Sequence, residues 1–301
     1  MLQDAHTHFF SRTFFTTLAK LSPRDDSPEA ILADVTGKTG LLLPEDDTAA
    51  HRDRWLAAMD AAGVERMVTF ASVPPEVPVV AEAAAGSGGR LVPYTIVDPS
   101  ADGALEFARK ARGELGYRGL LTFPAMHPVQ PSDERAAALY ALAAEHGAPV
   151  IVHCGILKVK LRDLVGLPRR YDVALANPLH LVPAADSHPD TTFVLPHFGG
   201  GYLREALMAG DQCENICVDT SSSNVWTRTH PGLALADVFA AALDVLGPER
   251  ILFGTDSGVF PRGYRGDLVE EQTAALATAG ASDADVEAIM GRNLERLLPR
   301  D

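Results

Sequence analysis

The feature that most constrains this chain is a repeated pair of segments, a short apolar run followed by an alanine-rich stretch with helical periodicity. Several of the runs are continuous apolar blocks, such as PVIVHC and RILFGTD. Blocks of this kind are typical of strands that are buried on both faces of a parallel sheet. The pattern predicts eight strands, at residues 2–5, 66–71, 91–97, 119–123, 148–153, 192–197, 216–220 and 251–255.

Helical patterns separate these runs. The segment RDRWLAAMDAAG places Trp55, Leu56 and Met59 on one face and ends at a glycine suited to cap a helix. Ser132 is the expected N-cap of a second helix, and Ser282 is the expected N-cap of the last one. The helices predicted in this way cover residues 52–63, 132–147, 234–246 and 283–298.

Strands and helices that alternate in this way fit an α/β protein with the architecture of a single (β/α)8 TIM barrel. Eight such units over 301 residues predict one barrel domain that spans residues 1–301. An open, doubly wound sheet is the competing architecture. It would normally have a glycine-rich dinucleotide-binding turn after its first strand, and DAHTHFF contains no such turn.

Residues 9–50 interrupt the alternation and predict a long insertion after the first strand. The segment contains several prolines and four phenylalanines, at positions 9, 10, 14 and 15. Structureless connections of this length are uncommon and often form lids or binding loops. A short extra helix or hairpin packed on the rim of the barrel is an equally acceptable interpretation.

Composition and charge exclude several classes of function. The chain has 26 Lys and Arg against 40 Asp and Glu, a net charge of −14, which argues against non-specific binding of nucleic acid. No apolar run approaches the roughly 18 residues of a membrane helix, and the opening MLQD does not resemble a signal peptide. Three cysteines do not make a disulfide framework. We therefore expect a soluble, cytoplasmic protein with a small-molecule substrate and no nucleic-acid or membrane partner, and a homodimer is left open.

Five side chains with metal-binding or proton-transfer chemistry stand at the ends of predicted strands. His6 and His8 end the first strand with a spacing of two, which places both imidazoles on one face. His153, His197 and Asp256 end the fifth, sixth and eighth strands. Because the carboxyl ends of barrel strands share one mouth, where catalytic groups lie, these five groups should converge there.

Imidazole nitrogens and one carboxylate are typical ligands for Zn²⁺, and they also suit Mn or Fe. Three neutral histidines with Asp256 leave room for a water molecule. A bound metal lowers the pKa of such a water from about 15.7 toward about 7. A further histidine nearby can polarise a substrate or move protons, because its pKa lies near neutral pH.

The motifs DAHTH, IVHCG, LPHFGG and LFGTDSG, in this order, resemble those of the amidohydrolase superfamily. The resemblance is closer to the amidohydrolase-related branch that includes aminocarboxymuconate-semialdehyde decarboxylase. It extends through AAMDAAGVERMV, NPLHL, ICVDTSS and GRNLERLL, and so covers nearly the whole chain. One departure is GTDSG, where many relatives have GTDSP; it bears only on the turn after Asp256.

The resemblance implies a role for each of the five residues. His6, His8, His153 and Asp256 become the metal ligands, and His197 becomes the catalytic group that orients water or substrate. Asp256 also shuttles a proton. Binuclear relatives carry a carboxylated Lys or a Glu on the fourth strand, and GLLTFPA has neither, which implies one divalent ion. Zinc is the first choice, with manganese or iron as alternatives.

Several other residues lie near these motifs. Cys154 should point into the helix layer, because it adjoins His153 on a strand. The remaining residues have two interpretations each. Asp219 either orients a metal ligand or anchors the neighbouring turn. His127 follows the fourth strand and either lines the pocket or lies outside it. The cations that follow the fifth and sixth strands either hold a substrate carboxylate or are solvated surface charges; they are Lys158, Lys160, Arg162 and Arg204.

The resemblance leaves the reaction open between two enzyme classes. The first is a mononuclear metal-dependent hydrolase, in which metal-activated water attacks an amide, ester or lactone carbonyl. The alternative is a metal-dependent non-oxidative decarboxylase, a carbon–carbon lyase acting on an aromatic or unsaturated carboxylate. A non-catalytic metal-binding barrel is a third hypothesis, and the complete ligand set argues against it.

Overall fold

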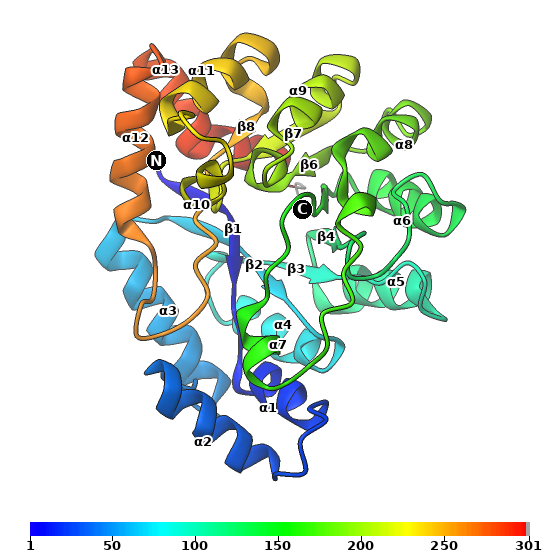
Figure 1. Cartoon of the computed structure of the whole chain (residues 1–301), viewed down its shortest axis with the longest axis vertical. Helices are drawn as coiled ribbons and strands as arrows, with labels where there is room; N and C mark the ends of the chain where they lie inside the picture. The colour runs from blue at the N-terminus through cyan, green and yellow to red at the C-terminus, as the bar shows by residue number, and fades with distance from the viewer. Residues whose placement is uncertain (299–301) are drawn as a thin grey trace.

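A parallel sheet of eight strands forms the centre of residues 1–298, which are the residues that the computed structural model describes (Figure 1). The strands are hydrogen-bonded in sequence order, and each neighbouring pair runs parallel. The strands are β1 (Gln3–His8), β2 (Arg66–Ala71), β3 (Leu91–Ile96), β4 (Gly119–Thr122), β5 (Val150–Val152), β6 (Phe193–Leu195), β7 (Ile216–Asp219) and β8 (Ile251–Leu252).

Backbone hydrogen bonds also join the last strand region to the first. The amide of Ala5 donates to the Phe253 carbonyl at 2.8 Å, and the amide of Asp256 donates to the His6 carbonyl at 2.9 Å. Thr7 and Ser257 form a parallel bridge farther along. These bonds bring the carboxyl end of β8 beside that of β1, so the sheet forms the (β/α)8 TIM barrel that the sequence predicts.

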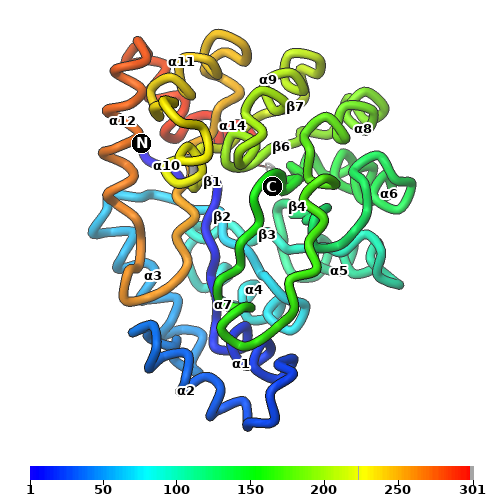
Figure 2. The backbone as a smooth tube through the Cα atoms, viewed as in Figure 1, coloured from blue at the N-terminus to red at the C-terminus, as the bar shows by residue number. Residues whose placement is uncertain are grey.

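Helices surround the strands, as the backbone tube shows (Figure 2). Short 3₁₀ segments and one π-helical segment (Ala288–Arg292) join or extend them. The α-helices of residues 1–298 are α1 (Arg12–Lys20), α2 (Pro28–Thr39), α3 (Thr48–Ala62), α4 (Val77–Ala85), α5 (Ala104–Leu115), α6 (Glu134–Glu145), α7 (Lys160–Leu164), α8 (Val182–Ser187), α9 (Leu203–Gln212), α10 (Ser223–Trp226), α11 (Leu235–Leu246), α12 (Gly266–Thr278), α13 (Asp283–Glu287) and α14 (Asn293–Leu297).

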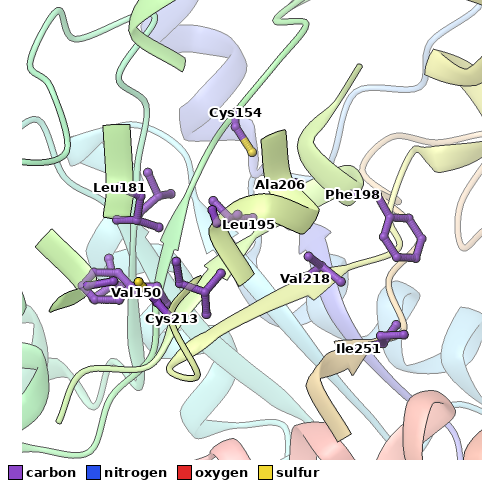
Figure 3. Packing of buried hydrophobic residues seen from close by; sticks show 14 of the residues in the cluster. Val150, Cys154, Leu181, Leu195, Phe198, Ala206, Cys213, Val218 and Ile251 are labelled. Atoms are coloured by element: carbon purple, nitrogen blue, oxygen red, sulfur yellow. The ribbon is translucent and has the colours of Figure 1, made fainter. Parts of the chain in front are cut away.

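Side chains of each strand alternate between the barrel interior and the layer beneath the helices. On β5, Ile151 belongs to the interior cluster, while Val150 and Val152 pack in the helix layer. Cys154 continues this alternation and is buried in the same helix-layer cluster (Figure 3). The expectation that Cys154 points away from the barrel mouth is confirmed, and His153 on the opposite face lines the cavity at that mouth.

The four predicted helices are present, with differences at two helix starts. The first, α3, begins at Thr48 rather than at Arg52. Ser282 caps the last helical region, because its hydroxyl accepts the Asp285 amide at 3.2 Å. The prediction that Ser132 caps α6 is wrong. Asp133 is the N-cap, since its carboxylate accepts the amide of Arg135 at 3.0 Å and so satisfies a donor that the helix cannot.

Residues 9–50 form structure of their own between β1 and α3. They contain α1 and α2, which pack with α7 and the segment after it into one apolar cluster that includes Phe14, Leu18, Leu161 and Val165. Figure 1 shows α1, α2 and α7 at the lower end of the view. The segment is therefore helical rather than structureless, and its role as a lid or as a packed addition to the rim stays a prediction.

No helix within residues 1–298 combines the length and the apolar character needed to cross a membrane.

Candidate active site and metal centre

Two histidines of β1 meet one carboxylate that follows β8. The Nε2 atom of His8 lies 3.4 Å from Oδ1 of Asp256, and the Nε2 atom of His6 lies 4.0 Å from the same oxygen. The two imidazole centroids are 5.7 Å apart. The sequence prediction that these three side chains converge at the barrel mouth is confirmed.

Each of these three groups is held by a second side chain from another element. Nδ1 of His6 donates to Oδ2 of Asp219 at 2.9 Å, which leaves Nε2 as the free, unprotonated nitrogen of the neutral ring. Nδ1 of His8 lies 3.1 Å from Oγ of Ser72. Ser222 donates its hydroxyl to Oδ2 of Asp256 at 2.6 Å. These contacts direct the two Nε2 atoms and Oδ1 of Asp256 at one point.

That arrangement fits a divalent metal ion. Ligand atoms about 2.0–2.2 Å from a tetrahedral ion lie roughly 3.3–3.6 Å from one another, close to the separations found around Asp256. Partners on the outer nitrogens of metal-binding histidines are usual in such sites. His153 adds a further sign, because its Nδ1 atom is buried with no hydrogen-bond partner in the described part of the chain.

The structure does not bring His153 into the same close group as His6, His8 and Asp256. Its ring instead stacks on Phe123 with centroids 4.6 Å apart and meets the ring of His197 edge-on at 5.2 Å. His153 therefore lies at the same mouth, and its place as fourth ligand stays a prediction.

His197 belongs to a hydrogen-bonded network around Asp219. Its Nδ1 atom donates to the Ser221 carbonyl at 2.9 Å, so the neutral ring keeps an unprotonated Nε2. Oδ1 of Asp219 accepts the amide of His197 at 3.1 Å and that of Ser221 at 2.9 Å. Asp219 thus holds the His6 ring and also anchors the turn that follows β7. Its role in orienting a metal ligand stays a prediction.

Three residues at the carboxyl end of the barrel have a strained backbone conformation. His197 has a φ of 61°, and Asp256 has a φ of 58°, both in the left-handed region that residues other than glycine seldom adopt. Ser222, which donates to Asp256, has a φ of 51°. Such strain is often found at functional sites, where the surrounding contacts hold it in place.

Burial and neighbouring charges shift the pKa of every group in the site. Burial alone would lower the pKa of His6, but Asp219 and Asp256 outweigh this effect and raise it. Burial lowers the pKa of His8, His153 and His197, so these three rings are held in the neutral form that binds metals. Burial alone would raise the pKa of Asp256, but His8 and His6 lower it and keep the carboxylate ionised.

A cavity of about 930 Å³ opens over these side chains. Its walls come from the segment with α1, the loop through α7, the residues around α10 and the loop after β8. His127 is not among the lining residues, although its neighbour Met126 is. Arg204 also lies outside the lining, whereas Lys158, Lys160 and Arg162 belong to it.

Phe10 links the cavity wall to the histidines. Its ring lies parallel to that of His8 with centroids 4.6 Å apart, and it stacks on Phe14 of α1 at 4.2 Å. A Cβ atom placed on Gly258 would come within 2.9 Å of the Phe10 ring. The GTDSG sequence thus has a physical reason here, because a larger residue after Ser257 would displace Phe10 from His8.

Sequence reasoning missed the serines that hold the site. Ser72 follows β2, and Ser221 and Ser222 follow β7, at the same edge of the barrel as the histidines. Their position was the available sequence signal. A hydroxyl residue directly after a buried strand lies at the mouth of the barrel, where metal-binding side chains need hydrogen-bond partners to orient them.

Comparison with known families decides the membership of the chain. The sequence profile of the amidohydrolase family matches residues 3–300. The chain belongs to the amidohydrolase family. No curated protein sequence matches this amidohydrolase.

Solved structures share the fold of this amidohydrolase over nearly its whole length. A 5-carboxyvanillate decarboxylase from Novosphingobium aromaticivorans with bound manganese is 15% identical, with a TM-score of 0.63 over 99% of this chain and 96% of that one. A probable 2-pyrone-4,6-dicarboxylic acid hydrolase from Acinetobacter baumannii is 12% identical, with a TM-score of 0.62 over 98% of both chains. An amidohydrolase from Burkholderia multivorans with bound zinc is 17% identical, with a TM-score of 0.61 over 99% of this chain and 100% of that one.

Proposed function

We propose that this amidohydrolase is a metal-dependent hydrolase that opens an amide, ester or lactone bond. The observation that carries the proposal is the convergence of the His6 and His8 Nε2 atoms on Oδ1 of Asp256, at 4.0 and 3.4 Å. His153 is the proposed fourth ligand. Zinc is the first choice of metal, with manganese or iron as alternatives, and solved relatives of this fold bind zinc or manganese.

A divalent ion held by His6, His8 and Asp256 would supply a Lewis acid and would lower the pKa of a bound water toward about 7. The residues of the chain supply the rest. Asp219 and Ser72 keep the rings of His6 and His8 in place. Ser222 leaves Oδ1 of Asp256 free to bind the ion or to accept a proton.

His197 is the proposed proton-transfer group. Its Nδ1 atom is fixed by the Ser221 carbonyl, and burial holds the ring neutral, so Nε2 is free to accept a proton from water. Once protonated, the same nitrogen can donate a hydrogen bond to a substrate oxygen. Its centroid lies 4.9 Å from that of His6 and 5.2 Å from that of His153. The proposed base thus lies beside the rings of two proposed ligands, which supports a role in proton transfer at the same site.

A non-oxidative decarboxylase is the second candidate function. Cationic side chains line the cavity, as the binding of a substrate carboxylate requires. A decarboxylase that acts on an aromatic acid shares the fold. The same metal site would then hold the carboxylated substrate, and a proton would replace the carbon dioxide that leaves.

Isotope labelling separates the two reactions. The metal-loaded protein is incubated in ¹⁸O-labelled water with a panel of lactones, esters and amides, and in parallel with aromatic and unsaturated carboxylates. A hydrolase incorporates ¹⁸O from water into its acid product, and we expect this label. Release of carbon dioxide with an unlabelled organic product would overturn the hydrolase proposal in favour of the decarboxylase.

A further inference from the structure

The charge of the cavity is opposite to that of the protein as a whole. The chain carries a net charge of −14, yet Asp256 is the only acidic residue among the described residues that line the cavity. Five cationic side chains line it, and none of them forms a hydrogen bond or an ion pair through its side chain within residues 1–298. They are Lys158, Lys160, Arg162, Arg228 and Arg262.

Such a cluster gives the cavity a positive potential. Like charges that line one cavity add to its field, and the low-dielectric walls focus that field. Many other cations of this chain pair with carboxylates; Arg169, for example, lies on the same connection as Arg162 and pairs with Asp163. An unpaired cluster at the mouth of the barrel is therefore a site in which an anion would be stabilised.

Arg162 is the most enclosed of the five cations. It is half-buried on α7, whereas the other four are exposed. Its Nε atom is buried and has no acceptor in the described residues. A buried guanidinium donor without an acceptor is expensive, and a planar oxyanion is its best partner.

The rest of the cavity suits a flat, apolar body. Phe10 and Phe14 form one stacked pair, and Phe123 stacks on His153. Trp226 and Phe260 complete the aromatic part of the lining. These side chains offer flat apolar surface against which an aromatic or conjugated ring can pack in offset-stacked or edge-to-face contacts.

We propose that the substrate carries a planar apolar body and an oxyanion that binds Arg162, apart from the group that reacts at the histidines. A carboxylate and a phosphate share this chemistry, and the aromatic lining selects an aryl acid over a sugar derivative. The assignment of a reacting end at His6, His8 and Asp256 rests on the proposed function, whereas binding of the anion at Arg162 does not need turnover.

Equilibrium binding to the metal-loaded protein tests this site, with isothermal titration calorimetry as the measurement. The probes are benzene-1,3-dicarboxylate, its uncharged diamide and phenyl phosphate. We expect the dicarboxylate to bind at least roughly tenfold more tightly than the diamide, with an affinity that falls as salt screens the cations. Binding of the diamide as tight as that of the dicarboxylate would overturn the proposal. A preference for the dicarboxylate over phenyl phosphate assigns a carboxylate, and the reverse preference assigns a phosphate.

Substitutions locate the anion. Arg162→Ala should weaken dicarboxylate binding by roughly 10–100-fold, the scale for losing a charge-assisted hydrogen-bonded pair. Arg162→Lys should keep part of the affinity, because it keeps the charge and loses the planar fork. Arg170→Ala is the matched control, since Arg170 is exposed on the same connection and outside the cavity lining. Unchanged binding in Arg162→Ala would overturn the assignment.

Two further measurements, of the fold and of turnover, distinguish failure of this inference from failure of the proposed function. Far-UV circular dichroism verifies the fold of each variant. If Arg162→Ala does not fold, the Arg162→Lys variant and the comparison of probes test whether Arg162 binds the anion. Binding of the dicarboxylate without formation of labelled acid or carbon dioxide would support the anion site and refute the proposed function. Hydrolysis of neutral lactones, together with equal binding of the dicarboxylate and the diamide, would refute only this inference.

Discussion

Asp219 at the end of β7 and His6 on β1 share a hydrogen bond of 2.9 Å between Oδ2 and Nδ1, and both side chains are buried. The bond fixes which nitrogen of His6 carries the proton and where the ring points. It also joins two strands whose residues lie 213 positions apart in the chain. The proposed metal site therefore depends on a residue outside the proposed set of ligands.

Asp219→Asn should weaken metal binding by roughly 10–100-fold, the usual effect of losing a partner behind a metal ligand. An amide can accept from only one side, so the donors His6, His197 and Ser221 cannot all be satisfied. Competition with a chelator measures the affinity. Asp211→Asn, an exposed change on α9, is the control. Equal affinities in the two variants would show that Asp219 serves the turn alone.

His8→Ala should leave the barrel folded and abolish metal binding at this site. Of the two histidines of β1, His8 has its Nε2 atom closer to Oδ1 of Asp256. Elemental analysis should give about one ion per chain for the unaltered protein and none for the variant. Cys154→Ser should keep the full metal content, since its side chain lies in the helix layer. Two ions per chain in the unaltered protein would contradict a mononuclear site.

His197→Ala should retain the metal and lose about 10²–10⁴-fold in rate, the scale of a proton-transfer group. The ring is held by Ser221 rather than by Asp256, so its removal leaves the other nitrogens in place. Metal content and kcat are measured on the same preparation. Loss of the metal from this variant would make His197 a ligand and refute the proposed role.

Glu76→Gln should lower the free energy of unfolding by about 1–3 kcal/mol near pH 5, because an amide leaves a buried donor without an acceptor. Oε1 of Glu76 accepts the amide of Ser11 at 2.6 Å, and Oε2 accepts that of Ser72 at 2.7 Å. Chemical denaturation measures the difference. Glu82→Gln, exposed on α4, should cost almost nothing.

The cost of Glu76→Gln should depend on pH. Burial raises the pKa of Glu76 from 4.5 to about 7. The folded state therefore holds this proton more tightly than the unfolded chain does, and the resulting stability is fully present below about pH 4.5 and is lost as the pH rises through about 7. The deficit of the variant should fall by an amount on the order of 3 kcal/mol between pH 4.5 and 8, so by pH 8 it should vanish or change sign. A deficit that grows with pH would contradict this sign.

Much of the fold was accessible from the sequence because its signals are local. Short strand-like runs, several of them continuous apolar blocks, marked all eight strands, and the alternation on β5 correctly directed Cys154 into the helix layer. A finer feature was missed at the start of α6, where Asp133 rather than Ser132 caps the helix. Both residue types are good caps, and only the backbone geometry decides which side chain reaches the free amide.

The sequence by itself determined that His6, His8 and Asp256 meet, because the carboxyl ends of parallel strands must share one edge of the barrel. The tertiary structure alone decided what surrounds them. Ser72 behind His8, Ser222 behind Asp256 and the unpaired Arg162 come from connections whose paths no strand periodicity fixes. Strand ends are positioned by a repeating hydrogen-bond pattern, whereas loop side chains are positioned by packing between segments far apart in the chain, which no local sequence signal encodes.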